Sequence, residues 1–333
     1  MLKYFFSLFI ILFGIYIDLS FYYILDSFSL LYILLFSLLS VSFIISLFLK
    51  RYYRLVLGVY LLSVGIWRYW YVGIKPSNNK EWQKDVEVLS YATFKGNLAH
   101  VYNIRDFKYK TEADYIPSYY DSVFDIDKLE GIDFIATYWM GKDIAHTFLS
   151  FSFSDGKHLA ISVEARKEKG ESYSVLGGFF KTTELYYVVA DEKDLIGLRT
   201  NIRKNPPEQV YMYKINAKLK NEKKVFINYL KKLNRLKEKP EFYNTLTTNC
   251  TTTIWNNSII NNDKTSFSWK ILLSGHSAEY LYEKNLLKTC GMSFKELEKK
   301  AYINPLVKDK NITKSYSFDI RNSISYCSEL QRH

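Results

Sequence analysis

Cys250 is the residue in this chain whose setting best suits nucleophilic chemistry. It stands in the stretch EFYNTLTTNCTTTIW (241–255), where Thr248 or Asn249 is a good N-cap, so a helix is predicted to begin at or near the cysteine. A thiol in the first turn of a helix loses its proton more readily, because the helix macrodipole is positive there. A buried structural cysteine is the alternative, and the polar neighbours argue against it.

The start of such a helix can also bind a negatively charged oxygen through its free backbone N–H groups. Four residues near the thiol are therefore candidates for binding a substrate or an oxyanion: Asn249, Thr251, Tyr243 and Asn244. The other cysteines, Cys290 and Cys327, lack this setting and are interpreted as structural. No pair of cysteines has the C-x-x-C spacing of a zinc or redox site, and neither a metal nor another cofactor is predicted.

A β-hairpin is predicted within the stretch AHTFLSFSFSDGKHLAISVEAR (145–166), which alternates apolar and polar residues on both sides of a turn. The apolar positions of the two strands must share the buried face, so Leu149 is expected to pair with Ile161. The loop then contains three residues and ends at Gly156, which supplies the left-handed conformation that such a loop uses.

The same register places His146 directly opposite Glu164 on the other face of the hairpin. Cross-strand neighbours have Cβ atoms about 4.5–5.5 Å apart, so the carboxylate can accept a hydrogen bond from one imidazole nitrogen. The other nitrogen is then free to act as a base for Cys250, with Glu164 as the orienting group. From the hairpin alone, a polar pair on a solvated sheet face explains the pattern equally well.

Residues 1–73 are predicted to be a membrane anchor. They contain five basic and two acidic residues and are otherwise apolar and aromatic. A secretory signal peptide would have one shorter apolar core and a cleavage site, whereas this segment has three apolar blocks, at about 4–17, 28–49 and 55–71. Because a spanning helix requires about 20 apolar residues, the first block is extended through Leu25, which gives about three transmembrane helices.

The charges beside these blocks predict the topology. Lys3 and the cluster of Lys50, Arg51 and Arg54 mark cytoplasmic ends, whereas the first loop carries Asp18 and Asp26. Three helices that start inside leave the rest of the chain outside, which in a bacterium with two membranes is the periplasm. We therefore expect a multi-pass protein of the bacterial inner membrane with its catalytic domain in the periplasm.

The rest of the chain is predicted to be a linker, residues 74–88, followed by one α+β domain, residues 89–333. A hairpin is expected around Gly96-Asn97, and strands precede helices along the chain, which favours an antiparallel sheet. The net charge of +8 on residues 74–333 favours contact with anionic lipid head groups, and the predicted topology excludes nucleic acid. The expected strands are 132–139, 145–153, 158–166, 185–189 and 210–215, and the expected helices span 221–237, begin near 250 and begin at 293.

Several longer stretches resemble the bacterial Lnb N-terminal periplasmic domain family, in order over about residues 76–290. They are PSNNKEWQKDV, VYNIRDFKYKTEADYIPSYYD, AHTFLSF, LAISVEARKEKGESYS, ELYYVVADEKDLIGLRTN and PEFYNTLTTNCTTTI. The resemblance implies a papain-like cysteine fold in which the histidine strand precedes the cysteine helix, a permuted order also found in lecithin:retinol acyltransferase-like and some NlpC-like proteins. On that pattern Cys250 matches the nucleophile and His146 the base, while Glu164 matches a motif position and owes its role to the register.

The family takes its name from a lipoprotein N-acyltransferase, which transfers a fatty acyl chain from lipid to the amino group of a lipoprotein's N-terminal cysteine. The resemblance therefore implies a thiol acyltransferase whose partners are membrane phospholipid and a lipoprotein N-terminus. One departure is that the membrane part of that acyltransferase follows the domain, whereas here it comes first. A papain-like peptidase or amidase acting on cell-wall peptides is the alternative, and a binding module with a degenerate site is opposed by the presence of both Cys250 and His146.

Overall fold

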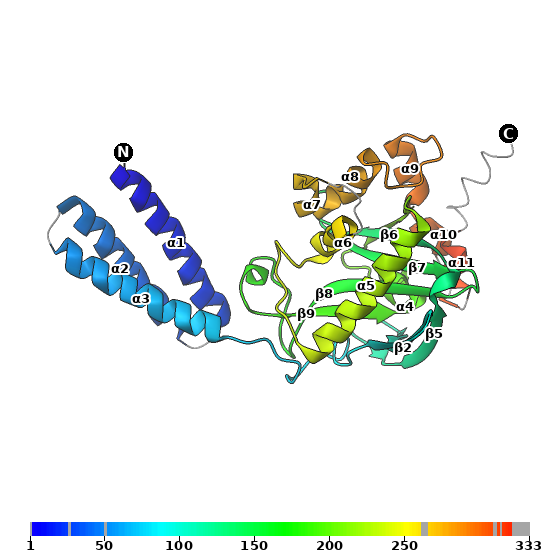
Figure 1. Ribbon diagram of the computed structural model, residues 1–333, viewed down its shortest axis with the longest axis horizontal. Coiled ribbons are helices and arrows are strands. Elements are labelled where there is room, and N and C mark those ends of the chain that lie inside the picture. Colours follow the sequence, from blue (N-terminus) through cyan, green and yellow to red (C-terminus); the bar gives the residue numbers. More distant parts are fainter. Residues whose placement is uncertain are drawn as a thin grey trace.

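The computed structural model describes residues 2–25, 28–49, 52–260, 266–308, 312–313 and 315–321. Figure 1 shows long N-terminal helices on one side and a body of strands and shorter helices on the other, joined by the segment after residue 73. Asp26, Lys50 and Arg51, whose charges predict the topology, lie outside the described residues, as does Cys327.

Three helices are long and apolar enough to cross a membrane: α1 (Leu2–Ile24), α2 (Ser29–Leu49) and α3 (Tyr53–Gly73). They confirm the three predicted helices. The helix α1 continues through Asp18 as the required length implied, so the placement of Asp18 in the first loop is wrong. The Asp18 carboxylate accepts a hydrogen bond from Ser37 at 2.7 Å, and the Trp67 indole donates one to Ser20 at 2.8 Å. These two hydrogen bonds link α1 to α2 and to α3, and each pairs a polar group that would be costly to leave unpaired in an apolar environment.

The body is built on a mainly antiparallel sheet of eight strands in the order β1-β2-β9-β8-β7-β6-β10, with β5 paired to β2. Only β2 and β9 run parallel in this sheet, through a single pair, Arg105 and Ala190. A separate short hairpin is formed by β3 (Lys108–Tyr109) and β4 (Tyr115–Ile116). The strands of the large sheet are β1 (Tyr91–Lys95), β2 (Leu98–Arg105), β5 (Tyr119–Asp125), β6 (Leu129–Tyr138), β7 (His146–Phe153), β8 (His158–Arg166), β9 (Glu184–Ala190) and β10 (Gln209–Lys214).

These strands confirm the hairpin around Gly96-Asn97 and the five other strands predicted from alternation. The mixed α+β class and the antiparallel character of the sheet are therefore correct. The sequence did not predict β5, whose residues YYDSVFD lack a regular alternation of apolar and polar side chains.

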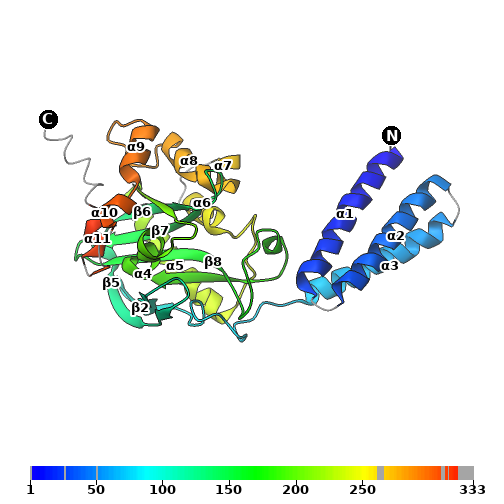
Figure 2. The same ribbon diagram turned by 180° about the vertical axis from the view of Figure 1, so that it is seen from behind.

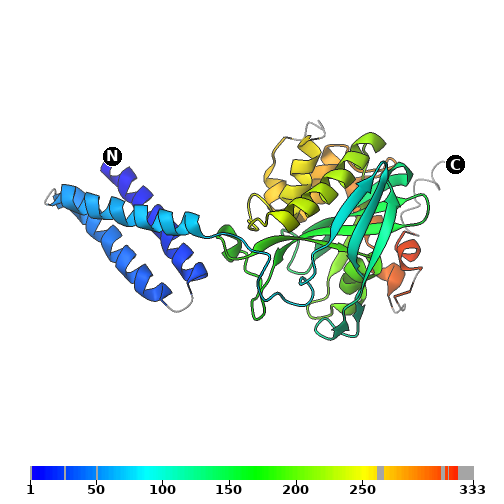
Figure 3. The ribbon, with the colours of Figure 1, turned by 60° about the horizontal axis from the view of Figure 1, so that its bottom comes forward.

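Helices cover both faces of the sheet (Figure 3). On one face α5 (Leu219–Glu238) buries Phe226 and Tyr229 against Phe151 of β7, with ring centroids 5.0 and 6.0 Å from the Phe151 ring. On the other face Phe148 and Ile135 lie in a second apolar cluster with residues of α4 (Glu192–Gly197), α10 (Asn304–Val307) and α11 (Tyr316–Asp319). Figure 2 shows α10 and α11 together at the end of the body far from the membrane helices.

The face that carries His146 is therefore not solvated. Its neighbours Phe148 and Ser162 are 1% and 0% exposed, so the explanation of a polar pair on a solvated sheet face is wrong. The reason is the second layer of helices, which the hairpin's own alternation does not reveal.

The hairpin has the predicted register. Leu149 pairs with Ile161 and Phe151 with Leu159, and the three-residue loop ends at Gly156, whose φ is 79°. A side chain at φ near 80° would strain the backbone, which explains the glycine. The last pair on this side of the hairpin is Phe148 and Ser162. Two residues further along each strand, the same register places His146 beside Glu164.

The remaining helices follow β10 and α5 in the chain and lie beside the start of β7. They are α6 (Cys250–Ile260), α7 (Trp269–Leu272), α8 (Ser277–Glu283) and α9 (Phe294–Ala301). The predicted helices at 221–237 and from Cys250 are confirmed, and α9 has the predicted capping box between Ser293 and Glu296.

A close backbone approach holds this helical region against the loop before β7. The Gly275 N–H donates to the Asp143 carbonyl at 3.0 Å, and its carbonyl accepts a hydrogen bond from the Tyr138 hydroxyl at 2.7 Å. A Cβ atom at position 275 would lie only 1.9 Å from the carbonyl oxygen of Lys142. Position 275 therefore admits only glycine without movement of the loop that leads into His146.

We predict that Gly275→Ala destabilises the body by about 1–3 kcal/mol, because the new methyl group meets backbone atoms that must move. Thermal unfolding of the full chain in detergent measures this. Gly65→Ala is the matched control, since no atom lies within 4 Å of the Cβ position at Gly65 in α3. Equal unfolding temperatures for the two variants would contradict the steric argument.

Candidate active site

Cys250 is the first residue of α6 and carries a free, partly exposed thiol. Asn249 caps the helix, because its side-chain oxygen accepts the Thr252 N–H at 2.7 Å while its own N–H donates to the Thr252 hydroxyl at 3.0 Å. The Asn249 carbonyl accepts the Thr253 N–H at 3.1 Å. Among the described residues, no hydrogen-bond acceptor is found for the N–H groups of Cys250 and Thr251, so these two groups remain available to bind an oxyanion.

His146 begins β7 and connects the thiol to a carboxylate. Its Nε2 lies 2.7 Å from the Ser162 hydroxyl and 3.4 Å from Glu164 Oε1, and the same hydroxyl donates to Glu164 Oε1 at 2.9 Å. The imidazole also interacts with the Cys250 thiol, and each group shifts the pKa of the other toward its charged form. Because Nε2 faces Ser162 and Glu164, Nδ1 is the nitrogen left for the thiol.

Two neighbours fix the ends of this chain of contacts. Arg199 donates to Glu164 Oε1 at 3.3 Å, which holds the carboxylate beside the imidazole. Thr147, the residue after His146, also lowers the pKa of the Cys250 thiol, and its Oγ1 lies 2.9 Å from the Thr251 hydroxyl. The start of β7 thus meets the start of α6 through two consecutive residues.

These contacts favour the charged forms of the thiol and the imidazole. Burial raises the pKa of Cys250, but the hydrogen bond and charge of His146 lower it further, from 9.0 to about 6. Burial lowers the pKa of His146, but its hydrogen bonds with Cys250 and Glu164 raise it, from 6.5 to about 9. The pair is therefore a thiolate and an imidazolium between about pH 6 and about pH 9.

Glu164 stays ionised over the same range. Burial raises its pKa, whereas the hydrogen bond and charge of His146 and the charge of Arg199 hold the pKa well below 4.5. A negative charge beside the imidazolium stabilises it and orients the ring, which is the role of the third member of a nucleophile, base and carboxylate set.

The structure brings Cys250, His146 and Glu164 together and distributes the other candidates around them. Thr251 is 4% exposed and faces Thr147. Tyr243 is 6% exposed, and its hydroxyl lies 3.4 Å from that of Tyr173. The side chains of Asn244 and Asn249 are engaged locally, since Asn244 accepts the N–H groups of Leu246 and Thr247 and Asn249 caps α6.

Sequence reasoning missed the residues that support the site, namely Thr147, Ser162, Tyr173 and Arg199. Ser162 could have been predicted from the sequence, because the hairpin register places it on the same face, opposite Phe148 and two residues from Glu164. Arg199 follows α4 in a separate segment, Leu198–Ile202, and no local pattern links it to Glu164.

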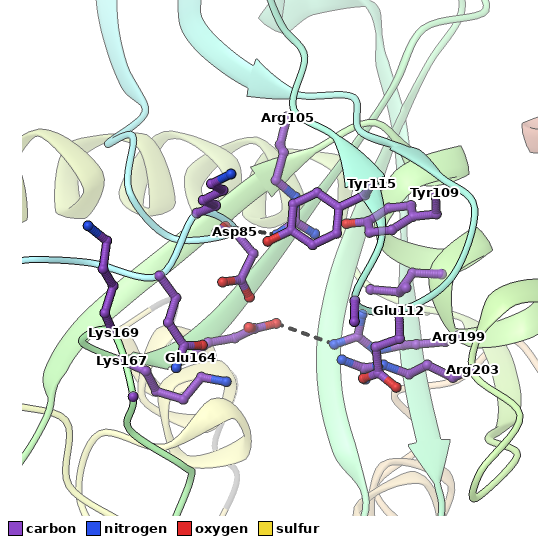
Figure 4. A pocket seen from close by; sticks show the side chains of 15 residues that line it. Asp85, Arg105, Tyr109, Glu112, Tyr115, Glu164, Lys167, Lys169, Arg199 and Arg203 are labelled. Atoms are coloured by element: carbon purple, nitrogen blue, oxygen red, sulfur yellow. Dashed lines mark hydrogen bonds and ion pairs between the residues drawn. The ribbon is translucent and has the colours of Figure 1, made fainter.

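A cavity of about 540 Å³ lies beside Glu164 (Figure 4). Glu164 and Arg199 both line it, and their ion pair crosses it in the figure. Its lining includes neither Cys250 nor His146. The charged side chains of its wall are Lys84, Asp85, Arg105, Glu112, Glu164, Lys167, Lys169, Arg199 and Arg203.

The fold and the site together define a membrane-anchored α+β protein with a cysteine, a histidine and a glutamate in mutual contact. Residues 115–275 match the model of the Lnb N-terminal periplasmic domain family. The match confirms the resemblance found in the sequence, over a narrower range, and contains Cys250, His146 and Glu164. Comparison with curated proteins and with solved structures gives no match.

We predict that alkylation of Cys250 by iodoacetamide follows a titration with its midpoint at about pH 6, because the thiolate is the reactive form and its pKa is about 6. In His146→Ala the midpoint should move up toward the ordinary 9.0, since the lowering interactions are lost. Mass spectrometry of the labelled peptide measures the rates, and Cys290 is disulfide-bonded and unreactive. A wild-type midpoint near 9 would rule out the ion pair.

Glu164→Gln should move the same midpoint to a value between those of wild type and His146→Ala, because the imidazolium loses the carboxylate that stabilises it. We expect the free energy of unfolding to change by less than about 1 kcal/mol. The rate at which Cys250 is acylated should fall by about tenfold or more, because the base is no longer oriented by a carboxylate. Glu112→Gln is the matched control, since Glu112 lines the same cavity but pairs with Arg203. If Glu164→Gln alkylates with the same pH dependence as wild type, Glu164 has no role in stabilising the imidazolium.

Proposed function

We propose that this protein is a membrane-anchored, cysteine-dependent acyltransferase that transfers a fatty acyl chain from phospholipid to the N-terminal amine of a lipoprotein. The observation that supports it most is the contact between Cys250 and His146 at the start of α6, which keeps the thiol ionised at neutral pH. The family match and the three apolar helices are consistent with a lipid substrate.

The reaction has two halves. The Cys250 thiolate attacks an ester carbonyl of the phospholipid, and the N–H groups of Cys250 and Thr251 stabilise the oxyanion. The ester C–O bond then breaks, His146 gives its proton to the departing lysophospholipid oxygen, and an acyl thioester remains on Cys250. In the second half the amine attacks the thioester, His146 accepts the amine proton, and the C–S bond breaks to release the amide and the thiolate.

The reaction moves an acyl group and changes no oxidation state, so the proposal needs neither a cofactor nor a metal. The membrane anchor fits the donor, because each CH₂ of a lipid chain buried in a bilayer contributes about 0.8 kcal/mol and a diacyl lipid does not readily leave the membrane. A catalytic site attached to the membrane reaches the ester without extracting the lipid.

We further propose that the body, residues 89–333, is the permuted papain-like domain and lies in the periplasm, with residues 1–73 anchored in the inner membrane and 74–88 as the linker. The order of β7 before α6 is consistent with the permutation, because the histidine precedes the cysteine. The disulfide at Cys290 supports an oxidising compartment, since cytoplasmic thiols are kept reduced.

The experiment that tests this function is mass spectrometry of the purified full chain after incubation with isotopically labelled phospholipid and no amine acceptor. We expect a hydroxylamine-labile acyl group on Cys250 in the wild type and none in Cys250→Ala, because only the thiol can form the thioester. Addition of a peptide with an N-terminal diacylglyceryl cysteine should discharge the acyl group onto its amine.

The same cysteine and histidine would also serve a papain-like peptidase or amidase. Absence of any acyl group on Cys250 across several donor lipids, with cleavage of a cell-wall peptide by the same preparation, would replace the proposed acyltransferase by this alternative. Alkylation of Cys250 at neutral pH shows that the site in the preparation is intact. If such a preparation carries out neither reaction, both the acyltransferase and the peptidase assignments are wrong.

A further inference from the structure

The segment between β8 and β9 contacts the outer ends of the membrane helices. Phe180 stacks on Tyr23 of α1 at 5.5 Å between ring centroids and lies 5.4 Å from the ring of Tyr16. Lys181 Nζ donates to the carbonyls of Tyr71 and Ile74, at the end of α3, at 2.8 and 3.3 Å. These contacts fix one end of the segment at the level where α1 and α3 end.

The other end of the same segment contacts the loop that precedes α6 and Cys250. Tyr173 faces Tyr243 across 3.4 Å, and the charge of the Cys250 thiolate is among the causes, after burial, that raise the pKa of the Tyr243 phenol. The loop before α6 is tied to it as well, because the Thr245 hydroxyl donates to the Val175 carbonyl at 2.9 Å and the Thr245 N–H donates to the Gly178 carbonyl at 2.9 Å.

Between these two anchors the segment presents large apolar side chains to the outside. Val175 and Leu176 are 47% and 57% exposed, Tyr173 is 49% exposed, and Leu246 from the adjoining loop is 47% exposed. We call these four residues the apolar loop surface. They come from two loops that are hydrogen-bonded to each other through Thr245 and Val175, and apolar side chains gathered in this way favour an interaction site over a freely solvated surface.

We propose that the apolar loop surface inserts into the outer face of the same bilayer that the three helices span, and so presents phospholipid to Cys250. The occupant is membrane lipid because the surface continues directly from the contacts of Phe180 and Lys181 with the ends of α1 and α3. Figure 1 shows the loop after β8 on the side of the body that faces these helices. This inference deepens the proposed function, since it names the surface through which the donor lipid arrives.

The depth of insertion matches the chemistry. An amphipathic surface buries its apolar side chains about 5–10 Å into the boundary between head groups and acyl chains. The ester bonds of a phospholipid lie at that boundary, and the loop that inserts there is hydrogen-bonded to the loop that ends at Cys250. Tyrosine is a residue that favours this boundary, which suits the position of Tyr173.

Fluorescence quenching in liposomes tests the insertion independently of catalysis. The full chain carries Leu176→Cys in a Cys250→Ala background, is labelled with an environment-sensitive fluorophore and is reconstituted with phosphatidylcholine that bears a nitroxide near its ester bonds. We expect blue-shifted, strongly quenched emission. Phe318→Cys is the matched control, because Phe318 is 69% exposed on α11, at the far end of the body (Figure 2). The Cys250→Ala parent measures background labelling. Equal, weak quenching at positions 176 and 318 would overturn the proposal.

A second measurement separates this proposal from the proposed function. In the double variant Val175→Asp with Leu176→Asp, thioester formation from a bilayer donor should fall by about tenfold or more, because two charged side chains oppose insertion into lipid. Thioester formation from dihexanoyl-phosphatidylcholine, dispersed as monomers, should stay within about twofold of wild type. Phe318→Asp should leave both rates unchanged, and Cys250 alkylation at neutral pH checks the fold of each variant.

The outcomes are distinct. Equal loss with both donors, or no loss with either, would overturn the insertion while the acyltransferase stands. A wild-type protein that forms no thioester with either donor would remove the acyltransferase, and quenching at position 176 alone would then decide the insertion.

Discussion

The register between β7 and β8 is the constraint on which the candidate site depends. A shift of one residue would turn every side chain of β8 to the opposite face, and Glu164 would leave His146 for the apolar cluster around Phe151. The register is fixed by burial of that cluster, in which Leu149 faces Ile161 and Phe151 faces Leu159. Hydrophobic side chains on one face therefore determine the geometry of the polar group on the other.

The same alternation explains how one strand end holds the thiol from two directions. Successive residues of a strand point to opposite faces, so His146 turns toward Ser162 and Glu164, while Thr147 turns toward α6 and its Thr251 hydroxyl. Cys250, at the start of α6, is influenced by both residues, since His146 and Thr147 each lower the pKa of its thiol. The imidazole supplies a charge and a proton, and Thr147 supplies hydrogen bonds that also favour the thiolate.

Ionised groups occupy the layer between the sheet and the α4 side of the body. Arg105 pairs with Asp194 at 2.8 Å, and Arg321 pairs with Glu192 at 2.6 Å, although both carboxylates are 0% exposed. Such pairs repay their desolvation only with good geometry and further hydrogen bonds, and here each carboxylate accepts more than one hydrogen bond that ties α4 to another segment. That arrangement positions the segment after α4, which carries Arg199 to Glu164.

The sequence by itself determined the elements whose signals are local. Apolar blocks, alternation and caps predicted the membrane helices, the hairpin with Glu164 opposite His146, and the start of α6 at Cys250, because each depends on residues close in the chain. The tertiary structure alone decided that β5 joins the sheet, that a second layer buries the His146 face, and that Arg199 and Thr147 complete the site. Glu192 of α4 looks like a surface residue until its partner Arg321, 129 positions away in the chain, is placed beside it. These features depend on contacts between distant segments, which arise only when the apolar faces of the sheet are covered, and alternation within one strand carries no information about what covers it.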